Sequence, residues 1–181
     1  WLAWGSYSAD RRQADLMIWS EEKRSLRTIP TSLNSIYSIA APAWTKDGQS
    51  VLIQGTSYEG QAFYRINVRT GEVTQLTNPV PTLLQAVGQD NQFTLHAMTP
   101  DERYYLKWGN QRNPDDPGRS RKMIWRVDAR TGEETELVRP SAGQVGSVSL
   151  VSPDGAWWAV TLLTAAPPAR EGGSSQANRG R

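Results

Sequence analysis

The segment Gly55–Gly60 comes closest to a catalytic motif. It reads Gly-Thr-Ser-Tyr-Glu-Gly, so Glu59 stands where the G-x-S-x-G elbow of serine hydrolases has its second glycine. The elbow also requires a sharp turn between a strand and a helix, whereas the residues around Ser57 predict a β-hairpin. The only histidine, His96, falls in a predicted strand, where we interpret it as a hydrogen-bonded structural residue and not as a general base. We therefore assign no catalytic residue.

The residue types in the sequence give little support for a metal-binding site. The chain has no cysteine and one histidine, which excludes sites built from several thiolates or imidazoles. The segment richest in oxygen ligands for Ca²⁺ lacks the spacing of a calcium-binding loop; its residues are Asn110, Asn113, Asp115 and Asp116. Ser152–Trp157 resembles the Asp box of sialidases, S-x-D-x-G-x-x-W, but Asp154 and Gly155 are adjacent in it. We predict no metal and no other cofactor.

Charge and composition narrow the class of protein further. The 181 residues carry 20 Lys and Arg against 18 Asp and Glu, a formal net charge of +2. Residues 165–181 supply that excess, so residues 1–164 are formally neutral, and nucleic acid is disfavoured as a partner. No apolar run approaches the roughly 20 residues of a membrane helix. Eight tryptophans indicate a folded core, and 15 glycines with 11 prolines indicate many turns.

Two sequence motifs recur in the same order along the chain. The first motif is a hydroxyl residue followed by a turn rich in Pro, Asp and Gly and then by a β-prone run. Its three copies contain Asp47, Asp101 and Asp154, which are 54 and 53 residues apart. The second aligns Tyr64–Leu76 with Trp125–Leu137 without a gap. A degenerate copy, Met17–Ile29, has Arg24 where the other two have glycine. Two coupled motifs in a fixed order indicate a repeated structural unit.

The motifs predict tight hairpins between antiparallel strands. Tyr64, Ile66 and Val68 alternate with their neighbours with the period of two that is typical of a strand. The turn residues accept a positive φ or preset the turn; they are Asp47, Gly48, Gly71, Pro100, Asp101, Gly132, Pro153, Asp154 and Gly155. In the degenerate copy, Arg24 is expected to mark a different turn.

Each repeat is expected to contain four strands, A to D. The expected strands are 1–7, 14–20, 25–29, 38–45, 50–55, 61–68, 73–77, 92–99, 103–108, 122–128, 134–138, 146–151 and 157–163. Four-stranded units that recur about every 50 residues are typical of a β-propeller. Trp125, aligned with Tyr64, is expected to pack between neighbouring units.

These residues resemble TolB-type, WD-like β-propeller repeats. The resemblance rests on the S-P-D-G turn at Ser152–Gly155, its variants at Thr45–Gly48 and Thr99–Glu102, and the ending R-T-G-E-x-T-x-L. It covers residues 1–163 and extends to tricorn-like proteins and to the N-terminal propellers of prolyl oligopeptidase and dipeptidyl peptidase IV relatives. Lys46 and Glu102 depart from the pattern at its turn Pro and turn Gly. The resemblance implies a periplasmic location, which the residues themselves do not determine.

We therefore predict an all-β fold, a partial β-propeller of about three four-stranded antiparallel blades. Its parts are a partial blade at 1–30 (strands B to D), full blades at 37–78 and 92–139, a partial blade at 146–163 (strands A and B) and a disordered tail at 165–181. Closed propellers have about 4–8 blades, so the chain is interpreted as a fragment. The alternative is an open β-solenoid. The isolated chain is expected to self-associate through apolar end faces that expose Leu2 or Trp4 and Trp157 or Trp158.

Binding is expected where the longer, variable loops gather. Alternating strand direction places the A–B and C–D turns at one end of each blade and the B–C and D–A loops at the other. Possible binding residues in these loops are Tyr58, Arg112 and Arg119. We predict a non-catalytic scaffold that binds a protein or peptide partner through this face. Two alternatives stay open: the gating propeller of a prolyl oligopeptidase-type serine peptidase whose catalytic domain lies elsewhere, and a sensor propeller fused to a DNA-binding or kinase domain.

Overall fold

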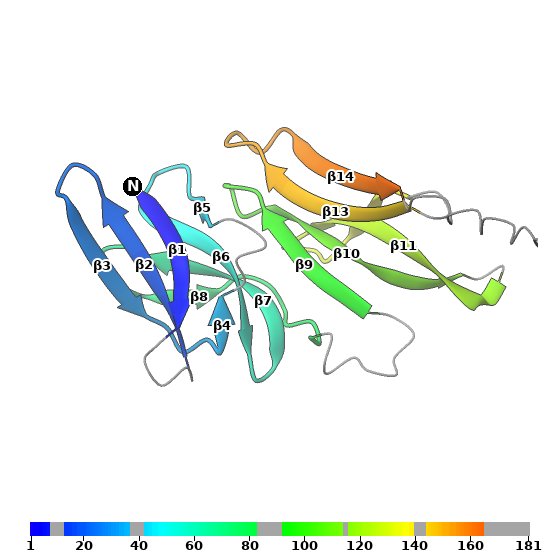
Figure 1. Ribbon diagram of the computed structural model, residues 1–181, viewed down its shortest axis with the longest axis horizontal. Helices are drawn as coiled ribbons and strands as arrows, with labels where there is room; N and C mark the ends of the chain where they lie inside the picture. Colours follow the sequence, from blue (N-terminus) through cyan, green and yellow to red (C-terminus); the bar gives the residue numbers. More distant parts are fainter. Residues whose placement is uncertain (8–12, 37–41, 83–91, 114–115, 140–143, 165–181) are drawn as a thin grey trace, which may run out of the picture.

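All regular structure in the described part of the chain is β-strand (Figure 1). The computed structural model describes residues 1–7, 13–36, 42–82, 92–113, 116–139 and 144–164. The expected disordered tail lies outside these residues. The strands are β1 (Leu2–Tyr7), β2 (Ala14–Ser20), β3 (Ser25–Pro30), β4 (Ser35–Ile36), β5 (Ala43–Trp44), β6 (Ser50–Ser57), β7 (Gly60–Asn67), β8 (Val73–Gln75), β9 (Gln92–Met98), β10 (Tyr104–Asn113), β11 (Asp116–Asp128), β12 (Glu134–Val138), β13 (Gln144–Val151) and β14 (Trp158–Thr164). The all-β prediction is confirmed.

The strands form four antiparallel sheets, which we number I to IV in chain order. Sheet I has the order β1-β2-β3, sheet III the order β9-β10-β11-β12, and sheet IV is the hairpin β13-β14. In sheet II, β4 and β5 both pair with β6, and β7 and β8 follow. Each sheet is therefore built from strands that follow one another along the chain, and apart from β4 and β5 consecutive strands of a sheet pair with each other, as short connections favour.

The repeat in the sequence is also a repeat in strand register. The second and third strands of the repeat place aligned residues opposite each other in three sheets; the pairs are Trp4–Met17 in sheet I, Ile53–Tyr64 in sheet II and Lys107–Trp125 in sheet III. The degenerate first copy therefore folds in the same register as the other two.

The sheets stack face to face, with an apolar core between each neighbouring pair. Because side chains alternate between the faces of a strand, β6 directs Val51 and Ile53 toward sheet I and Leu52 toward sheet III. Trp125 is buried in the core between sheets II and III, as predicted. Figure 1 shows sheets I, II and III side by side and sheet IV over sheet III.

Strands of successive sheets contact each other. Strands β1 and β2 contact β4, β6 and β7 contact β9, and β9 contacts β13. The third core joins Leu106 and Ile124 of sheet III to Trp158 and Val160 of sheet IV. Successive antiparallel sheets that stack in this way form a partial β-propeller.

One expectation about the strands is wrong, and another lies partly outside the described residues. Of the expected strand 38–45, the structure describes β5, and residues 38–41 lie outside the described part; β4 was not expected. The expected loop Asn110–Arg121 is instead largely the end of a long hairpin, since β10 and β11 stay paired as far as Asn113 and Asp116. These residues are mostly polar and show no apolar alternation, so the sequence predicted a loop. The predicted blade boundaries stay predictions.

Candidate functional site

The A–B turn has the same hydrogen bonds in sheets II, III and IV. In sheet II, the Thr45 hydroxyl donates to Asp47 Oδ1 at 2.6 Å, and the Gln49 N–H donates to the same oxygen at 3.0 Å. The Ser50 N–H donates to Thr45 Oγ1 at 3.0 Å. The corresponding residues are Thr99, Asp101, Arg103 and Tyr104 in sheet III, and Ser152, Asp154, Ala156 and Trp157 in sheet IV. Each turn therefore holds one carboxylate in a fixed position.

These hydrogen bonds keep the turn aspartates ionised. The Thr45 hydroxyl contributes most to lowering the pKa of Asp47 below its ordinary value of 3.8. The Thr99 hydroxyl does the same for the pKa of Asp101. A hydrogen bond to the charged form of a carboxyl group favours that form. Both aspartates therefore carry a negative charge at neutral pH.

The C–D turns have the positive φ that their glycines predict. Gly71 has φ 80° and Gly132 has φ 74°. In sheet II, Asn67 Oδ1 accepts hydrogen bonds from the N–H groups of Arg69 and Thr70, both at 2.9 Å. Asp128 Oδ1 accepts the equivalent two bonds in sheet III.

The expectation that Arg24 marks a different turn is wrong. Arg24 itself has φ 46°, a left-handed conformation that costs a non-glycine residue about 1–2 kcal/mol. Trp19 opposes Leu26 in sheet I as Ile66 opposes Val73 in sheet II. In the position of Asn67, Ser20 Oγ accepts a hydrogen bond from the Lys23 N–H at 3.2 Å. The sheet register and this capping bond preserve the turn without its glycine.

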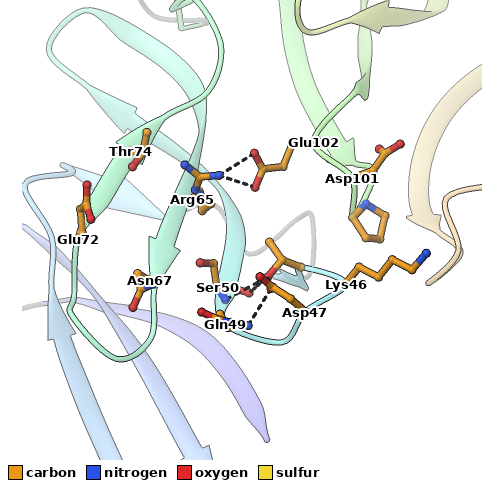
Figure 2. A pocket seen from close by; sticks show the side chains of 12 residues that line it. Lys46, Asp47, Gln49, Ser50, Arg65, Asn67, Glu72, Thr74, Asp101 and Glu102 are labelled. Carbon is orange, nitrogen blue, oxygen red and sulfur yellow. Dashed lines mark hydrogen bonds and ion pairs between the residues drawn. The ribbon is translucent and has the colours of Figure 1, made fainter.

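A polar groove lies where the A–B turns of sheets II and III meet the C–D turn of sheet II (Figure 2). Its volume is about 470 Å³. Its lining residues are Thr45, Lys46, Asp47, Gln49, Ser50, Arg65, Asn67, Glu72, Thr74, Pro100, Asp101 and Glu102. We call this cavity the turn groove. It is at the end of the sheets that carries the short turns, opposite to the end at which the sequence predicted binding.

An ion pair crosses the turn groove between two sheets. Arg65 Nη1 of β7 donates to Glu102 Oε1 at 3.2 Å and to Oε2 at 3.1 Å (Figure 2). Glu102 occupies the turn position that is glycine in sheets II and IV, and its φ is 60°. Its left-handed backbone therefore directs a carboxylate toward sheet II, where a glycine would offer none.

The turn groove carries a net negative charge. Four carboxylates line it against two cations, and Arg65 and Glu102 neutralise each other. Asp47, Glu72 and Asp101 then face Lys46 alone. Within the residues that the structure describes, the Glu72 carboxylate forms no hydrogen bond or ion pair. This local charge is opposite in sign to the net charge of the chain.

The predicted binding residues lie at other places. Tyr58 is 90% exposed at the tip of the β6–β7 hairpin, which is a two-residue turn closed by Ser57 and Gly60. Arg112 lies in β10 and Arg119 in β11, so both are on strands and not in a loop. All three belong to B–C hairpins, and none lines the turn groove.

Ser57 and His96, which the sequence analysis did not assign to catalysis, lie in a hairpin and in a buried strand. Ser57 Oγ accepts a hydrogen bond from the Glu59 N–H at 3.2 Å within a hairpin, so the strand–turn–helix context of a nucleophile elbow is missing there. His96 is buried in β9 with its ring edge-on to Trp108, at 6.2 Å between ring centroids. Across the described ranges, no three His, Cys, Asp or Glu side chains are grouped as metal ligands, and no helix has the length and hydropathy of a membrane span.

Sequence reasoning missed most of the turn groove. It singled out Asp47 and Asp101 as turn residues and gave no role to Arg65, Glu72 or Thr74. The available signal was the comparison of the chain's own repeats. Lys46 replaces the proline and Glu102 the glycine of the S-P-D-G turn, and both departures line the groove.

Comparisons with known proteins give fold similarity at low sequence identity. No family model matches the sequence, and no curated protein matches it. TolB from Acinetobacter baumannii has 17% identity and a TM-score of 0.49 over 90% of this chain and 37% of that chain. The β-propeller domain of the Trilobed protease from Pyrococcus furiosus has 13% identity and a TM-score of 0.47 over 88% and 48%. A prolyl endopeptidase has 13% identity and a TM-score of 0.48 over 93% and 25%.

The chain thus spans less than half the length of each of these proteins. Each match covers at least 88% of this chain.

Proposed function

We propose that this chain is a non-catalytic β-propeller segment that binds a protein or peptide partner, and that a basic segment of the partner occupies the turn groove. The observation that carries the proposal is the groove itself, an open cavity of about 470 Å³ with more carboxylates than cations. That volume is within the range of ligand pockets, roughly 300–1,000 Å³.

The fixed charges of the groove favour a cationic ligand. Asp47 and Asp101 are held by their turns, so their carboxylates need little reordering when a ligand binds. Glu72 and Lys46 are exposed side chains that no other described residue pairs. A lysine or arginine of the partner gains charge-assisted hydrogen bonds to such carboxylates.

The remaining lining residues suit a peptide. Thr45, Gln49, Asn67 and Thr74 bring hydroxyl and amide groups to the groove wall. These groups can donate to or accept from the main chain of a bound segment. The Arg65–Glu102 pair crosses the groove, and Figure 2 shows it between Thr74 and Asp101. It could exchange partners with a ligand that carries both charges.

The test is the binding of labelled peptides measured by fluorescence anisotropy. Wild type should bind a Lys/Arg-rich peptide more tightly than acidic or uncharged peptides of equal length, and added salt should weaken the binding. Glu72→Lys should weaken the binding of the basic peptide about tenfold, because it replaces an attractive charge by a repulsive one.

The matched control is Glu59→Lys, the same charge change at the exposed tip of the β6–β7 hairpin. It should alter the affinity less than twofold. Equal losses in both variants, or no preference for the basic peptide, would contradict binding in the turn groove. A loss confined to Glu59→Lys and Tyr58→Ala would instead place the partner on the variable-loop face. Tyr58 is the exposed aromatic residue that favours this second surface.

The proposal also excludes hydrolysis by this chain. Ser57→Ala and His96→Ala should leave any background hydrolysis of peptide or ester substrates unchanged. A rate that either substitution abolishes would contradict the non-catalytic assignment.

A further inference from the structure

Arg65 and Glu102, which form the ion pair across the turn groove, come from adjacent sheets. Arg65 lies in β7, the third strand of its repeat, and Glu102 lies in the A–B turn of sheet III. Arg65 Nη1 donates to both carboxylate oxygens of Glu102, at 3.2 Å and 3.1 Å. The pair therefore shows how a carboxylate from the next sheet is held at this position of the repeat.

The next two sheets repeat the arginine without the glutamate. By strand register, Arg126 of β11 has the position of Arg65, because each arginine lies opposite a buried leucine on one side and a threonine on the other. In the A–B turn of sheet IV, Gly155 has the position of Glu102, with φ 74° against 60°. The backbone of the turn is thus preserved in sheet IV, but glycine brings no carboxylate to Arg126.

The A–B turn of sheet IV lies against that of sheet III. A Cβ on Gly155 would be 3.5 Å from Thr99 and 3.7 Å from Pro100, which are ordinary contact distances. Strand β11 contacts β13 as β7 contacts β9. Every residue that corresponds to the lining of the turn groove belongs to the described part of the chain. The same two elements, a third strand and the next A–B turn, therefore meet at both places.

Arg126 is half-buried beside an aromatic ring. Its Cζ lies 4.7 Å from the centroid of the Tyr104 ring, which stands where sheet II has Ser50. Arg103 also lies over this ring, at 4.8 Å, but Asp128 matches its charge, with 3.6 Å between Nε and Oδ2. A guanidinium that contacts a ring with its face can still donate from the N–H groups at its edge.

The C–D turn does not supply a carboxylate to Arg126. Glu133 of this turn corresponds to Glu72, because their carbonyl groups accept the equivalent backbone hydrogen bonds. Arg65 pairs with Glu102 and not with Glu72. Among the residues that the structure describes, Arg126 likewise forms no ion pair, with Glu133 or with any other carboxylate. Its charge is therefore matched by no group of its own repeat.

We propose that Arg126 binds a carboxylate of a partner molecule, in the place that the Glu102 carboxylate takes beside Arg65. Pairs of a guanidinium and a carboxylate are charge-assisted and directional, which favours this planar anion as the ligand. An Asp or Glu side chain and the C-terminus of a peptide present the same group, so the experiment separates these two sources. The inference does not depend on a basic segment in the turn groove.

The experiment is an NMR titration of the ¹⁵N-labelled chain with three short Gly/Ser peptides. The first carries one central glutamate and blocked ends, the second a glutamine there and a free C-terminal carboxylate, and the third a glutamine and blocked ends. The Arg126 Nε–H signal and the amides of Tyr104 and Gly155 should shift and saturate with the first or the second peptide and not with the third. One ion pair binds weakly, so the preference of the turn groove for basic peptides should persist.

Two substitutions exchange the two interfaces. Gly155→Glu places a carboxylate beside Arg126 and should weaken binding of the peptide at least fivefold. Glu102→Gly removes the carboxylate from Arg65, whose Nε–H signal should then respond to the peptide as well. Arg126→Gln should abolish the response at Tyr104 and Gly155. Arg130→Gln, at an exposed arginine of the C–D turn of sheet III, is the matched control and should stay within twofold of wild type. A thermal melt checks that each variant is folded.

Three results would overturn the carboxylate site. In the first, neither carboxylate peptide shifts the Arg126 signal. In the second, Gly155→Glu binds the peptide as tightly as wild type. In the third, Arg130→Gln and Arg126→Gln lose equal affinity, which would indicate attraction by general surface charge. A failure of Lys/Arg-rich peptides to bind would instead contradict only the proposal for the turn groove.

Discussion

Arg24 and Glu102 adopt backbone conformations that glycine supplies at the equivalent positions of the other repeats. Their φ angles are 46° and 60°, and those of Gly132 and Gly155 are both 74°. The sequence showed that both positions depart from the repeat, but it did not show that the turns persist. Persistence depends on the register of whole strands, which overrides the preference of one residue. Local propensity alone therefore predicted a different turn at Arg24 incorrectly.

The free-energy cost of a non-glycine residue in these turns can be measured by replacing a turn glycine and by restoring one. Gly132→Val should lower the free energy of unfolding by about 1 kcal/mol or more, because valine disfavours a positive φ. Nothing lies within 4 Å of a Cβ built on Gly132, so the effect should be one of backbone strain without steric overlap. Arg24→Gly should instead stabilise the chain by about 0.5 kcal/mol. Urea unfolding measures both values, and equal stability in all three proteins would contradict the shared turn geometry.

The turn aspartates predict acid sensitivity. The folded-state pKa values of Asp47, Asp101, Asp128 and Asp154 are all lowered below the ordinary 3.8. A lowered folded-state pKa adds stability that is fully present above the ordinary value and is lost as pH falls through the folded-state value. Stability should therefore change little between pH 7 and about 5 and should fall steeply below about pH 4.

Thermal melts across this pH range measure the effect. Asp47→Asn combined with Asp101→Asn should flatten the acid limb, because these variants carry no titrating group in the two turns. Glu59→Gln is the control, since its side chain belongs to none of these turns. An acid limb that keeps its slope in the double variant would show that other carboxyl groups cause it.

At the scale of elements, sheet III holds a buried cation on the face that packs on sheet II. Lys107 of β10 is 8% exposed and pairs with Glu134 of β12. Its Nζ lies 4.3 Å from the centroid of the Phe93 ring and 5.1 Å from that of Trp125. At the same register position, sheet I has Trp4 and sheet II has Ile53. The strand pattern predicted this position as part of a packing face, but it could not predict how a charge there would be compensated.

This arrangement predicts unequal effects of removing either partner. Glu134→Leu leaves the Lys107 charge buried without its carboxylate and should destabilise the chain by about 2–4 kcal/mol. Lys107→Met leaves Glu134 half-exposed to solvent, where it can be hydrated, and should change stability by less than about 1.5 kcal/mol. Urea unfolding of both variants measures the difference. A greater loss for Lys107→Met would show that the ion pair is not what stabilises this interface.

At the scale of the whole molecule, most of the fold that could be predicted from the sequence followed from its repeated motifs. The period of two, the turn residues and the two coupled motifs predicted an all-β chain of stacked hairpins, and the sheets confirm it. The long β10–β11 hairpin was not foreseen, because its residues Asn110–Asn113 and Asp116–Arg121 carry no apolar pattern in the sequence. The turn groove was missed because it forms between the turns of two sheets. Its residues, from Thr45 through Glu72 to Glu102, are up to 57 positions apart in the chain.

The most direct test of the proposed function is to map the bound partner onto one end of the sheets. In an NMR titration of the ¹⁵N-labelled chain with a Lys/Arg-rich peptide, the largest amide shift changes should fall at Lys46–Ser50, Glu72 and Asp101–Glu102. The amides of Ser57–Gly60, at the opposite end of sheet II, should move little. Saturable changes at Ser57–Gly60 with none around the turn groove would contradict the account.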